Sequence, residues 1–328
     1  MRTLAVLEGL RSWGMAALLV AAVSGSAAAQ QPYPSQDIHV INGYPAGSGS
    51  DVIVRYFTEK LRRLAGRAII VENKPGANGS IATEYVARAR PDGYVTLLHA
   101  GGGIAGNMHL FKKPPVDAGK ALQMVATLNL QAFMLTVASN SPYKTAAELT
   151  AAMKAKGDKA TYATSSTASR TAGGVYKYYA GLSAVEVQYR QGNDTLNDMA
   201  SGAIDFAFHD PVLALSQMRE GKLRVLGLAS QRRLEAAQGI PTLAEQGFPK
   251  IDLTGWFAVS VPAATPRPIV DQLNAWYNQI LAMPETREFL YKAGGDPFIS
   301  TPDEAQAYFL AQIEAQGEAI RAAKIEPQ

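Results

Sequence analysis

A short loop rich in glycine and serine follows the first strand pattern of the chain. It reads GYPAGSGSD over residues 43–51 and leads into a helix pattern. Gly47 and Gly49 let the backbone bring N–H groups close to a ligand, and Ser48 or Ser50 is suited to cap the helix. Free N–H groups at a helix N-terminus favour negative charge, so the loop is typical of an anion site. An ordinary capped strand-to-helix turn explains the same residues equally well.

A second loop of this kind stands later in the chain. It reads TSSTASRT over residues 164–171 and again lies between a strand pattern and a helix pattern. Four hydroxyl side chains lie between Thr164 and Thr167, and Arg170 follows them. A guanidinium can hold a carboxylate by two hydrogen bonds. The alternative is a solvated helix cap with a surface arginine. Two anion-compatible loops would suit a ligand with a carboxylate at each end.

The histidines are not spaced as a metal site. They are His39, His99, His109 and His209, with no H-E-x-x-H pattern. His39 falls within a strand pattern, which favours a structural role. His99 and His209 end predicted strands, where a side chain can reach a cleft. We predict no metal site and no cofactor.

A glycine run at residues 100–103 follows His99 and resembles the oxyanion loop of esterases. A serine hydrolase of that type also needs a G-x-S-x-G elbow. The segment starting at Gly47 is not one, because the residue two positions later is glycine. We therefore interpret the run as a backbone-lined loop against a ligand.

Asp210 stands directly after the strand pattern IDFAFH. A carboxylate at a strand end could accept hydrogen bonds from a ligand hydroxyl or amine. It could equally cap the helical segment at residues 211–219. Both readings remain open from the residues alone.

Composition narrows the class of protein. The chain has 328 residues, 47 % of them hydrophobic and 18 % charged, which is typical of a globular protein with room for two domains. A formal net charge of +3, without runs of like charge, argues against nucleic-acid binding. The absence of cysteine excludes disulfides, thiolate zinc sites and cysteine nucleophiles.

The N-terminus has the features of a secretory signal peptide. Arg2 and Arg11 precede the short apolar stretch Met15–Val23, and small residues follow up to Ala29. We predict cleavage near Ala29, with residues 1–29 as the signal peptide. No later apolar stretch is long enough to cross a bilayer, so we expect a periplasmic protein.

Strand and helix patterns alternate along the mature chain, with turn-rich loops such as Asn73–Ser80, which predicts an α/β fold with parallel strands. Two long apolar stretches, Met124–Ser139 and Leu253–Val261, bracket a self-contained α/β unit. We read the first as two strands or as one strand that passes between domains. We expect one lobe from residues 36–128 plus 255–328 and a second lobe from residues 129–254, with a ligand cleft between them.

Short motifs along the whole mature chain resemble the solute receptors of tripartite tricarboxylate transporters, the Bordetella uptake gene (Bug) type. The matching motifs are Tyr33-Pro34-Ser35, Tyr44-Pro45-Ala46-Gly47, Val71-Glu72-Asn73-Lys74-Pro75-Gly76-Ala77, Pro91-Asp92-Gly93-Tyr94, Tyr162-Ala163, Gly202-Ala203-Ile204-Asp205, Gly221-Lys222-Leu223-Arg224, Pro241-Thr242-Leu243-Ala244-Glu245-Gln246-Gly247 and Gly255-Trp256-Phe257. Their order and spacing make the match specific.

This resemblance implies a periplasmic-binding-protein fold of type II, a Venus flytrap with two α/β lobes joined by two crossing strands. It implies a non-enzymatic, monomeric receptor that closes around a small carboxylate and delivers it to membrane permease subunits, without nucleic acid as a partner. The first loop, the Ser/Thr loop and the strand end near Asp210 would hold the ligand. The expected ligand-binding residues are Tyr44, Ala46, Gly47, Ser48, Gly49, Ser50, Ala100, Gly101, Gly102, Ser165, Ser166, Thr167, Ser169, Arg170, Thr171, Tyr189, His209 and Asp210.

The chain departs from the family pattern where the ligand should lie. Gly43 stands where the family has proline, the first loop has the order Gly-Ser-Gly, and Arg170 is unusual. The family's Y-K-G becomes Tyr189-Arg190-Gln191-Gly192. These departures argue against transferring any particular substrate of the family to this chain. We expect a di- or tricarboxylate or an aromatic acid, the latter suited to flanking tyrosines such as Tyr44. Two other functions remain open, a ligand-sensing partner of a membrane sensor kinase and a secreted hydrolase using Ser48 or Ser50 with His99.

Overall fold

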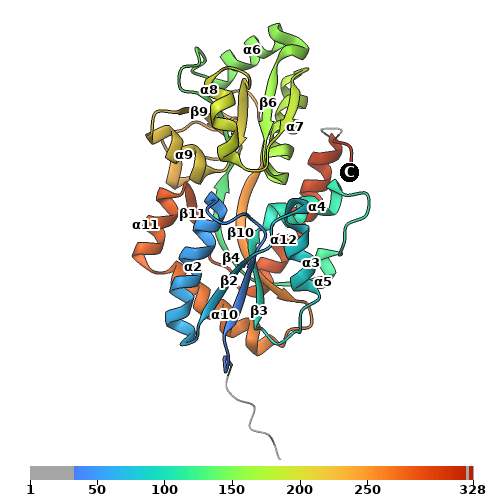
Figure 1. The fold of residues 1–328 in the computed structure, drawn as a ribbon, viewed down its shortest axis with the longest axis vertical. Coiled ribbons are helices and arrows are strands. Elements are labelled where there is room, and N and C mark those ends of the chain that lie inside the picture. The colour runs from blue at the N-terminus through green and yellow to red at the C-terminus, as the bar shows by residue number, and fades with distance from the viewer. Residues whose placement is uncertain (1–32, 323–324, 328) are drawn as a thin grey trace, which may run out of the picture. The chain divides into compact units, whose positions relative to one another are not determined.

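The computed structural model describes residues 33–322 and 325–327, without the side chain of Thr167. The predicted signal peptide, residues 1–29, lies outside this range. Residues from Gln36 onward form one compact unit. This unit contains two β-sheets, each with parallel and antiparallel strands and each packed against helices (Figure 1).

The first sheet is built around a parallel core. Its strand order is β11-β4-β10-β3-β1-β2, in which β1 pairs in parallel with β2 and β3, while β10 is antiparallel to both β3 and β4. The strands are β1 (Ile38–Asn42), β2 (Ile69–Asn73), β3 (Val95–Ala100), β4 (Leu122–Ala132), β10 (Thr254–Pro262) and β11 (Gly295–Pro297). We call this sheet and its helices lobe 1.

The second sheet has the order β7-β6-β8-β5-β9. Strand β6 is parallel to β7 and β8, and β5 is antiparallel to β8 and β9. The strands are β5 (Met134–Ala138), β6 (Thr161–Thr164), β7 (Val185–Gln188), β8 (Phe206–His209) and β9 (Leu223–Leu228). We call this sheet and its helices lobe 2.

Amphipathic helices cover both faces of the first sheet. In α2 (Gly49–Ala65), the apolar positions Ile53, Phe57 and Leu61 recur every four residues and are fully buried. Helix α2 packs with α10 (Arg267–Leu281) on one side of the sheet in Figure 1. On the other side lie α3 (Ser80–Ala87), α4 (Gly101–Leu110), α5 (Ala118–Ala121) and α12 (Pro302–Ala322). Helix α11 (Pro284–Lys292) packs beside β11.

An aromatic cluster forms the core of lobe 2. The ring of Tyr176 meets Phe206 and Phe208 edge-on, both at 5.6 Å between centroids. Tyr176 lies on α7 (Thr167–Ala180), so this contact fastens α7 to the sheet. The other helices of lobe 2 are α6 (Ala146–Lys156), α8 (Leu196–Ala200) and α9 (Pro211–Arg219).

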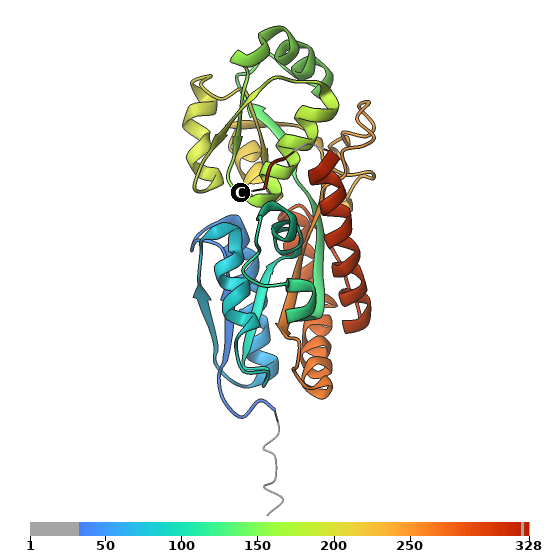
Figure 2. The same cartoon turned by 90° about the vertical axis from the view of Figure 1, so that its right-hand side faces the viewer.

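The chain passes between the two sheets where the apolar stretches predicted it. Within 124–139, β4 ends at Ala132 in the first sheet and β5 begins at Met134 in the second, which confirms the reading as two strands. The second stretch becomes β10, which returns the chain to the first sheet. Helix α12 also reaches lobe 2, where Ala319 packs against its core (Figure 2). The residue limits of the lobes stay a prediction.

Two segments that we expected as loops are helical. Helix α7 begins at Thr167, inside the segment 164–171 that we expected as a loop, because Ser166 and Ser169 form a capping box. Helix α4 begins at Gly101, within the glycine run. Glycine disfavours a helix interior, but a Cβ at Gly101 would lie 2.3 Å from the buried ring of Trp256. Close packing against Trp256 therefore requires glycine at position 101.

Candidate functional site

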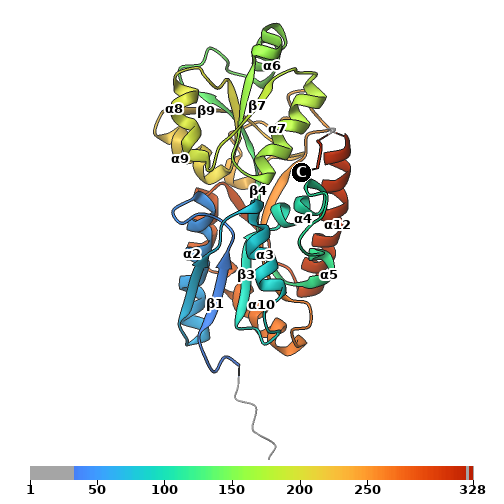
Figure 3. The ribbon, with the colours of Figure 1, turned by 45° about the vertical axis from the view of Figure 1, so that its right-hand side comes forward.

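The N-termini of three helices converge where the lobes meet (Figure 3). A cavity of about 70 Å³ lies there and opens beside a larger one of about 290 Å³. The smaller cavity is lined by Ser48, Gly49 and Ser50 at the start of α2, by Ala100, Gly102 and Gly103 at the start of α4, and by Ser165, Ser166 and Ala168 at the start of α7. Both lobes thus contribute helix starts to one site.

The first turns of these helices leave N–H groups for a ligand. In α2, Ser48 Oγ accepts from the N–H of Asp51 at 3.2 Å, so the first two N–H groups of the helix, at Gly49 and Ser50, lie beyond the reach of this cap. In α4, the residue at the N-cap position is Ala100, which has no side-chain acceptor. Partial positive charge at three helix ends makes this cavity favourable for an anion.

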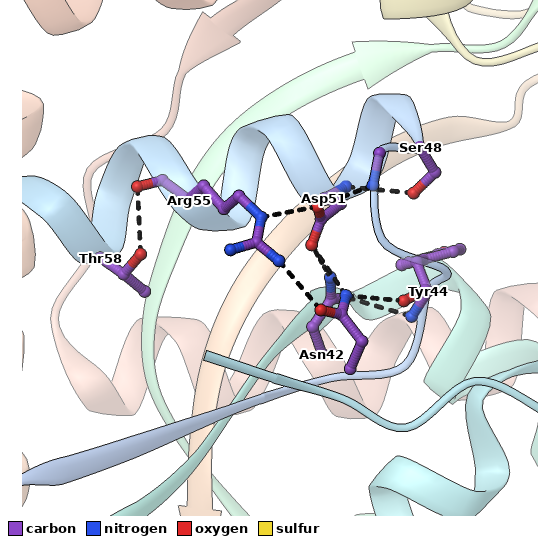
Figure 4. Close-up of polar contacts among 8 residues, drawn as sticks. Asn42, Tyr44, Ser48, Asp51, Arg55 and Thr58 are labelled. Atoms are coloured by element: carbon purple, nitrogen blue, oxygen red, sulfur yellow. Dashed lines mark hydrogen bonds and ion pairs between the residues drawn. The ribbon is translucent and has the colours of Figure 1, made fainter. Parts of the chain in front are cut away.

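A buried carboxylate holds the first loop in place (Figure 4). Asp51 accepts hydrogen bonds from Asn42 at 3.0 Å and from Asn73 at 2.8 Å, and it also accepts the N–H of Gly47 at 2.9 Å. Arg55 donates to the same carboxylate at 2.7 Å. The last residue of GYPAGSGSD is therefore the support of the loop, not part of its ligand-facing surface.

The hydrogen bonds decide the protonation state of Asp51. Burial would raise the pKa of this carboxyl, but the donors on Asn73, Arg55 and Gly47 outweigh burial and hold its pKa below the ordinary value. Asp51 is therefore ionised at neutral pH, as its four donors require.

Ser169 supports the second loop in a similar way. Its Oγ accepts from the backbone N–H groups of Ser165 at 2.8 Å and Ser166 at 2.9 Å, while its own N–H donates to Ser166 Oγ. Ser169 is 1 % exposed. Ser165 and Ser166 line both cavities, whereas Ser169 lies behind them.

Tyr44 lies over His99 in the wall of the site. The two rings stack with 4.4 Å between centroids and 14° between planes. His99 Nδ1 lies 3.0 Å from the carbonyl oxygen of Ala100, and the ring is packed so tightly that a Cβ on Gly43 or Gly79 would lie 2.5 Å from Nε2. Burial lowers the pKa of His99 to about 4, so the ring is neutral. A side chain at position 43 would therefore displace this ring, so the packing requires glycine there.

Asp210 lies at the contact of the lobes. It caps α9 by accepting the N–H of Leu213 at 3.1 Å, which confirms the capping alternative. A Cβ on Gly49 would lie 2.8 Å from Asp210 Oδ1, so α2 and α9 approach each other across this carboxyl group. Burial raises the pKa of Asp210, and burial together with the charge of Asp210 raises the pKa of the Tyr44 hydroxyl.

The two arginines of the larger cavity differ in their surroundings. Arg170 Nε lies 3.3 Å from Glu186, whose carboxylate also accepts from Thr164 at 2.9 Å. Arg190 is exposed and lines both cavities, and no ion pair joins it to a carboxylate in the described part of the chain. Arg190, absent from our expected site residues, is the cation with the least neutralised charge beside these cavities.

The residues we expected at the site fall into two sets. Those that line one of the two cavities at the lobe contact are Tyr44, Ser48, Gly49, Ser50, Ala100, Gly102, Ser165, Ser166, Arg170, Tyr189 and Asp210, and Gly47 lines a third cavity of about 230 Å³ beside Asp210 and Val212. Those outside the cavity linings are Ala46, Gly101, Ser169, Thr171 and His209. Thr167 begins α7, and its side chain is outside the described atoms.

His209 faces the interior of lobe 2. Its Nδ1 lies 2.8 Å from the Thr136 hydroxyl and its Nε2 lies 2.9 Å from the Thr195 hydroxyl. Burial lowers its pKa to about 4. Both ring nitrogens are thus used inside the lobe.

Sequence reasoning missed one whole wall of the larger cavity. This wall is the segment 75–79, which we interpreted as a turn. Its backbone is left-handed over successive residues, with φ of 44° at Ala77 and 53° at Asn78. Such angles are uncommon for residues other than glycine and are typical of functional sites. The Pro-Gly-Ala-Asn-Gly composition was the available signal.

The arrangement does not resemble a hydrolase or a metal centre. In the described part of the chain, His99 makes no hydrogen bond to a serine hydroxyl, since Nδ1 faces Ala100 and Nε2 lies against glycines. The described residues contain no cluster of three or more His, Asp or Glu side chains able to hold a metal ion. None of the described helices is long and apolar enough to cross a membrane.

This chain is similar in sequence and in fold to known proteins. The chain is 30 % identical to a UPF0065 protein of Bordetella bronchiseptica, over 98 % of this chain and 96 % of the relative. Its fold matches the periplasmic binding protein BugD with a TM-score of 0.83 and 26 % identity, covering 90 % of this chain and all of BugD. It also matches R. palustris Rpa4515, solved with adipate, with a TM-score of 0.85 and 23 % identity over 90 % of this chain and all of Rpa4515.

A family profile covers most of the described chain. Residues 53–325 match the family described as the tripartite tricarboxylate transporter family receptor, TctC. The matched range includes most of both sheets and the starts of α4 and α7. This chain belongs to the tripartite tricarboxylate transporter receptor family, whose members are solute-binding proteins and not enzymes.

Proposed function

We propose that this protein is a periplasmic receptor that binds a small organic carboxylate between its lobes and delivers it to the permease subunits of a membrane transporter. The observation that carries the proposal is the convergence of the α2, α4 and α7 N-termini on one cavity. Backbone N–H groups and serine hydroxyls at those three ends are donors for a carboxylate, and the three helix dipoles favour its charge.

The size of the site supports a small solute. The two adjoining cavities, of about 290 and 70 Å³, share Tyr44, Pro45, Gly103 and other lining residues. Their combined volume is at the lower end of the range of volumes for small-molecule pockets. Rpa4515, which shares the fold, was solved with adipate, a solute of this size class.

Closure of the lobes is the second part of the proposal. Helices from both lobes line the cavities, so a bound carboxylate would join α7 of lobe 2 to α2 and α4 of lobe 1. Since the solute contacts both lobes only when they approach, binding would stabilise the closed form. Permease subunits could then recognise the closed receptor, which is the role that family membership supports.

A thermal-shift and calorimetry screen tests the proposal. The protein is purified from the periplasm of bacteria that express the full chain and is screened against mono-, di- and tricarboxylates, aromatic acids and neutral sugars. A carboxylate present at about 100 times its Kd should add about 2.7 kcal/mol to the free energy of unfolding. The proposal is wrong if no carboxylate raises the melting temperature while a neutral solute does.

A further inference from the structure

The larger cavity is bounded by two features that belong to opposite lobes. From lobe 1 comes the segment Pro75–Gly79, and from lobe 2 comes Arg190 with its neighbours Gln188 and Tyr189. We expected neither the segment nor Arg190 among the ligand-binding residues. We propose that they form a second anion subsite, so that Arg190 selects solutes with two carboxylates over those with one. This inference rests on the proposed function, because the first carboxylate must occupy the helix N-termini.

The lobe 1 wall offers backbone donors. The carbonyl oxygen of Asn78 is tied to the side chain of Asn107 at 2.8 Å, and the N–H of Gly79 donates to the carbonyl oxygen of Gly76 at 2.9 Å. The N–H groups of Ala77 and Asn78 donate no hydrogen bond within the part of the chain that is described. Consecutive left-handed residues therefore leave two N–H groups beside the cavity, a backbone arrangement suited to an anion.

The lobe 2 wall offers a cation. The carboxylate of Glu186 lies 3.3 Å from Arg170 and accepts hydrogen bonds from Thr164 and Gln188. These groups already use a carboxylate oxygen of Glu186 as their acceptor. The hydroxyl of Tyr189 donates its hydrogen bond to Asp198. Arg190, in contrast, is exposed and has no ion-pair partner among the described residues. A guanidinium of this kind can hold a carboxylate in a bidentate contact.

The position of Arg190 suits a solute with a carboxylate at each end. It lines both the larger cavity and the smaller one at the helix N-termini, so it lies along the path between the two proposed subsites. A solute carboxylate at the helix starts would leave its other end in the larger cavity. There a second carboxylate would meet Arg190 and the N–H groups of Ala77 and Asn78, whereas an alkyl end would leave those donors unpaired.

The test uses ligands that differ only in the second charge. Adipate, its monomethyl ester and hexanoate are titrated into wild-type protein, Arg190→Ala and Arg190→Lys by calorimetry, and succinate and glutarate repeat the comparison at shorter lengths. We expect the best diacid to bind wild-type protein at least about 10-fold more tightly than its monoester. Arg190→Ala should weaken the diacid by about 10- to 100-fold and the monoester by less than about 3-fold, and Arg190→Lys should recover part of the loss.

The matched control is Arg232→Ala, which removes an exposed arginine that lines neither cavity. It should leave every affinity unchanged, and both Ala variants should keep the wild-type melting temperature without ligand. Equal loss for diacid and monoester, or no loss for either, would overturn the second subsite while leaving carboxylate binding intact. If wild-type protein binds none of these acids but binds another carboxylate of the thermal-shift screen, this inference is wrong and the proposed function stands, whereas binding of no carboxylate at all overturns both.

Discussion

Gly49 of lobe 1 lies directly against Asp210 of lobe 2, so closely that a Cβ on Gly49 would stand 2.8 Å from the carboxylate Oδ1. Val212 would lie at 3.0 Å from the same Cβ. The contact brings the N-terminal ends of α2 and α9 together beside the smaller cavity. The absence of a side chain at Gly49 is therefore a condition for this contact between the lobes.

Gly49→Ala should hinder closure. The added methyl group must separate α2 from α9 or displace Asp210, and overpacking of this kind has an effect of about 1–3 kcal/mol. We expect the affinity for the best carboxylate to fall by about 10-fold or more, measured by calorimetry, and the ligand-induced decrease in radius of gyration to shrink in solution scattering. Gly239→Ala is the control, because no atom lies within 4 Å of its added Cβ. Unchanged closure in Gly49→Ala would contradict the steric argument.

Asp210→Asn should alter the pH dependence of stability. Burial raises the pKa of Asp210, so the folded protein holds this proton more tightly than the unfolded chain does. The stability that this group contributes is present below the unfolded pKa, about 3.9, and is lost as pH rises through the folded pKa. Asparagine keeps the helix cap but does not ionise. Urea unfolding of both proteins is measured from about pH 3.5 to 7.5. As pH rises, the free energy of unfolding of the variant should therefore increase relative to that of wild type. A constant difference would show that Asp210 is not the titrating group.

His99 and His209 should make the protein sensitive to acid. Both have a pKa of about 4 in the folded protein because they are buried, against about 6.5 in the unfolded chain. The unfolded chain binds the extra protons between these values, so stability is complete above about pH 6.5 and is lost as pH falls toward about 4. Each histidine should account for on the order of 3 kcal/mol.

The histidine prediction is checked with His99→Gln and His209→Gln. Each variant should show a shallower loss of unfolding free energy between about pH 6.5 and 4 than wild type, and the double variant should be shallower than either. An acid limb of the same steepness in the double variant would assign the sensitivity to other groups.

Asp51→Asn should be far more damaging than Arg55→Ala. The carboxylate of Asp51 is 2 % exposed and accepts from four donors, and an amide in its place would direct N–H groups at some of them. Leaving buried donors unpaired in this way should lower the free energy of unfolding by about 2–4 kcal/mol. Arg55, with a side chain 52 % exposed, should matter by less than about 1 kcal/mol. Denaturant unfolding of both variants measures the contrast, and similar losses would mean that the loop does not depend on the carboxylate.

Secondary structure was predictable where apolar periodicity was clear. The strand pattern before the loop at residues 43–51 and the helix pattern after it became β1 and α2, because each element buries apolar residues at regular positions. The starts of α4 and α7 were not predictable in the same way. Glycine and hydroxyl residues favour loops locally. The Ser166–Ser169 capping box starts α7 within the Ser/Thr segment, and the close approach of Trp256 explains why glycine stands at position 101 at the start of α4.

The amino-acid sequence by itself determined the family, the α/β class and the two loops that carry anion-compatible residues, since these depend on residue type and order along the chain. Tertiary structure decided which residues share a surface. It placed Arg190 and the left-handed segment at Ala77 and Asn78 beside the same cavity, and it turned His209 toward the threonines of its own lobe. Such contacts join residues distant in the chain, so they depend on how the two sheets and their helices pack, which no local pattern encodes.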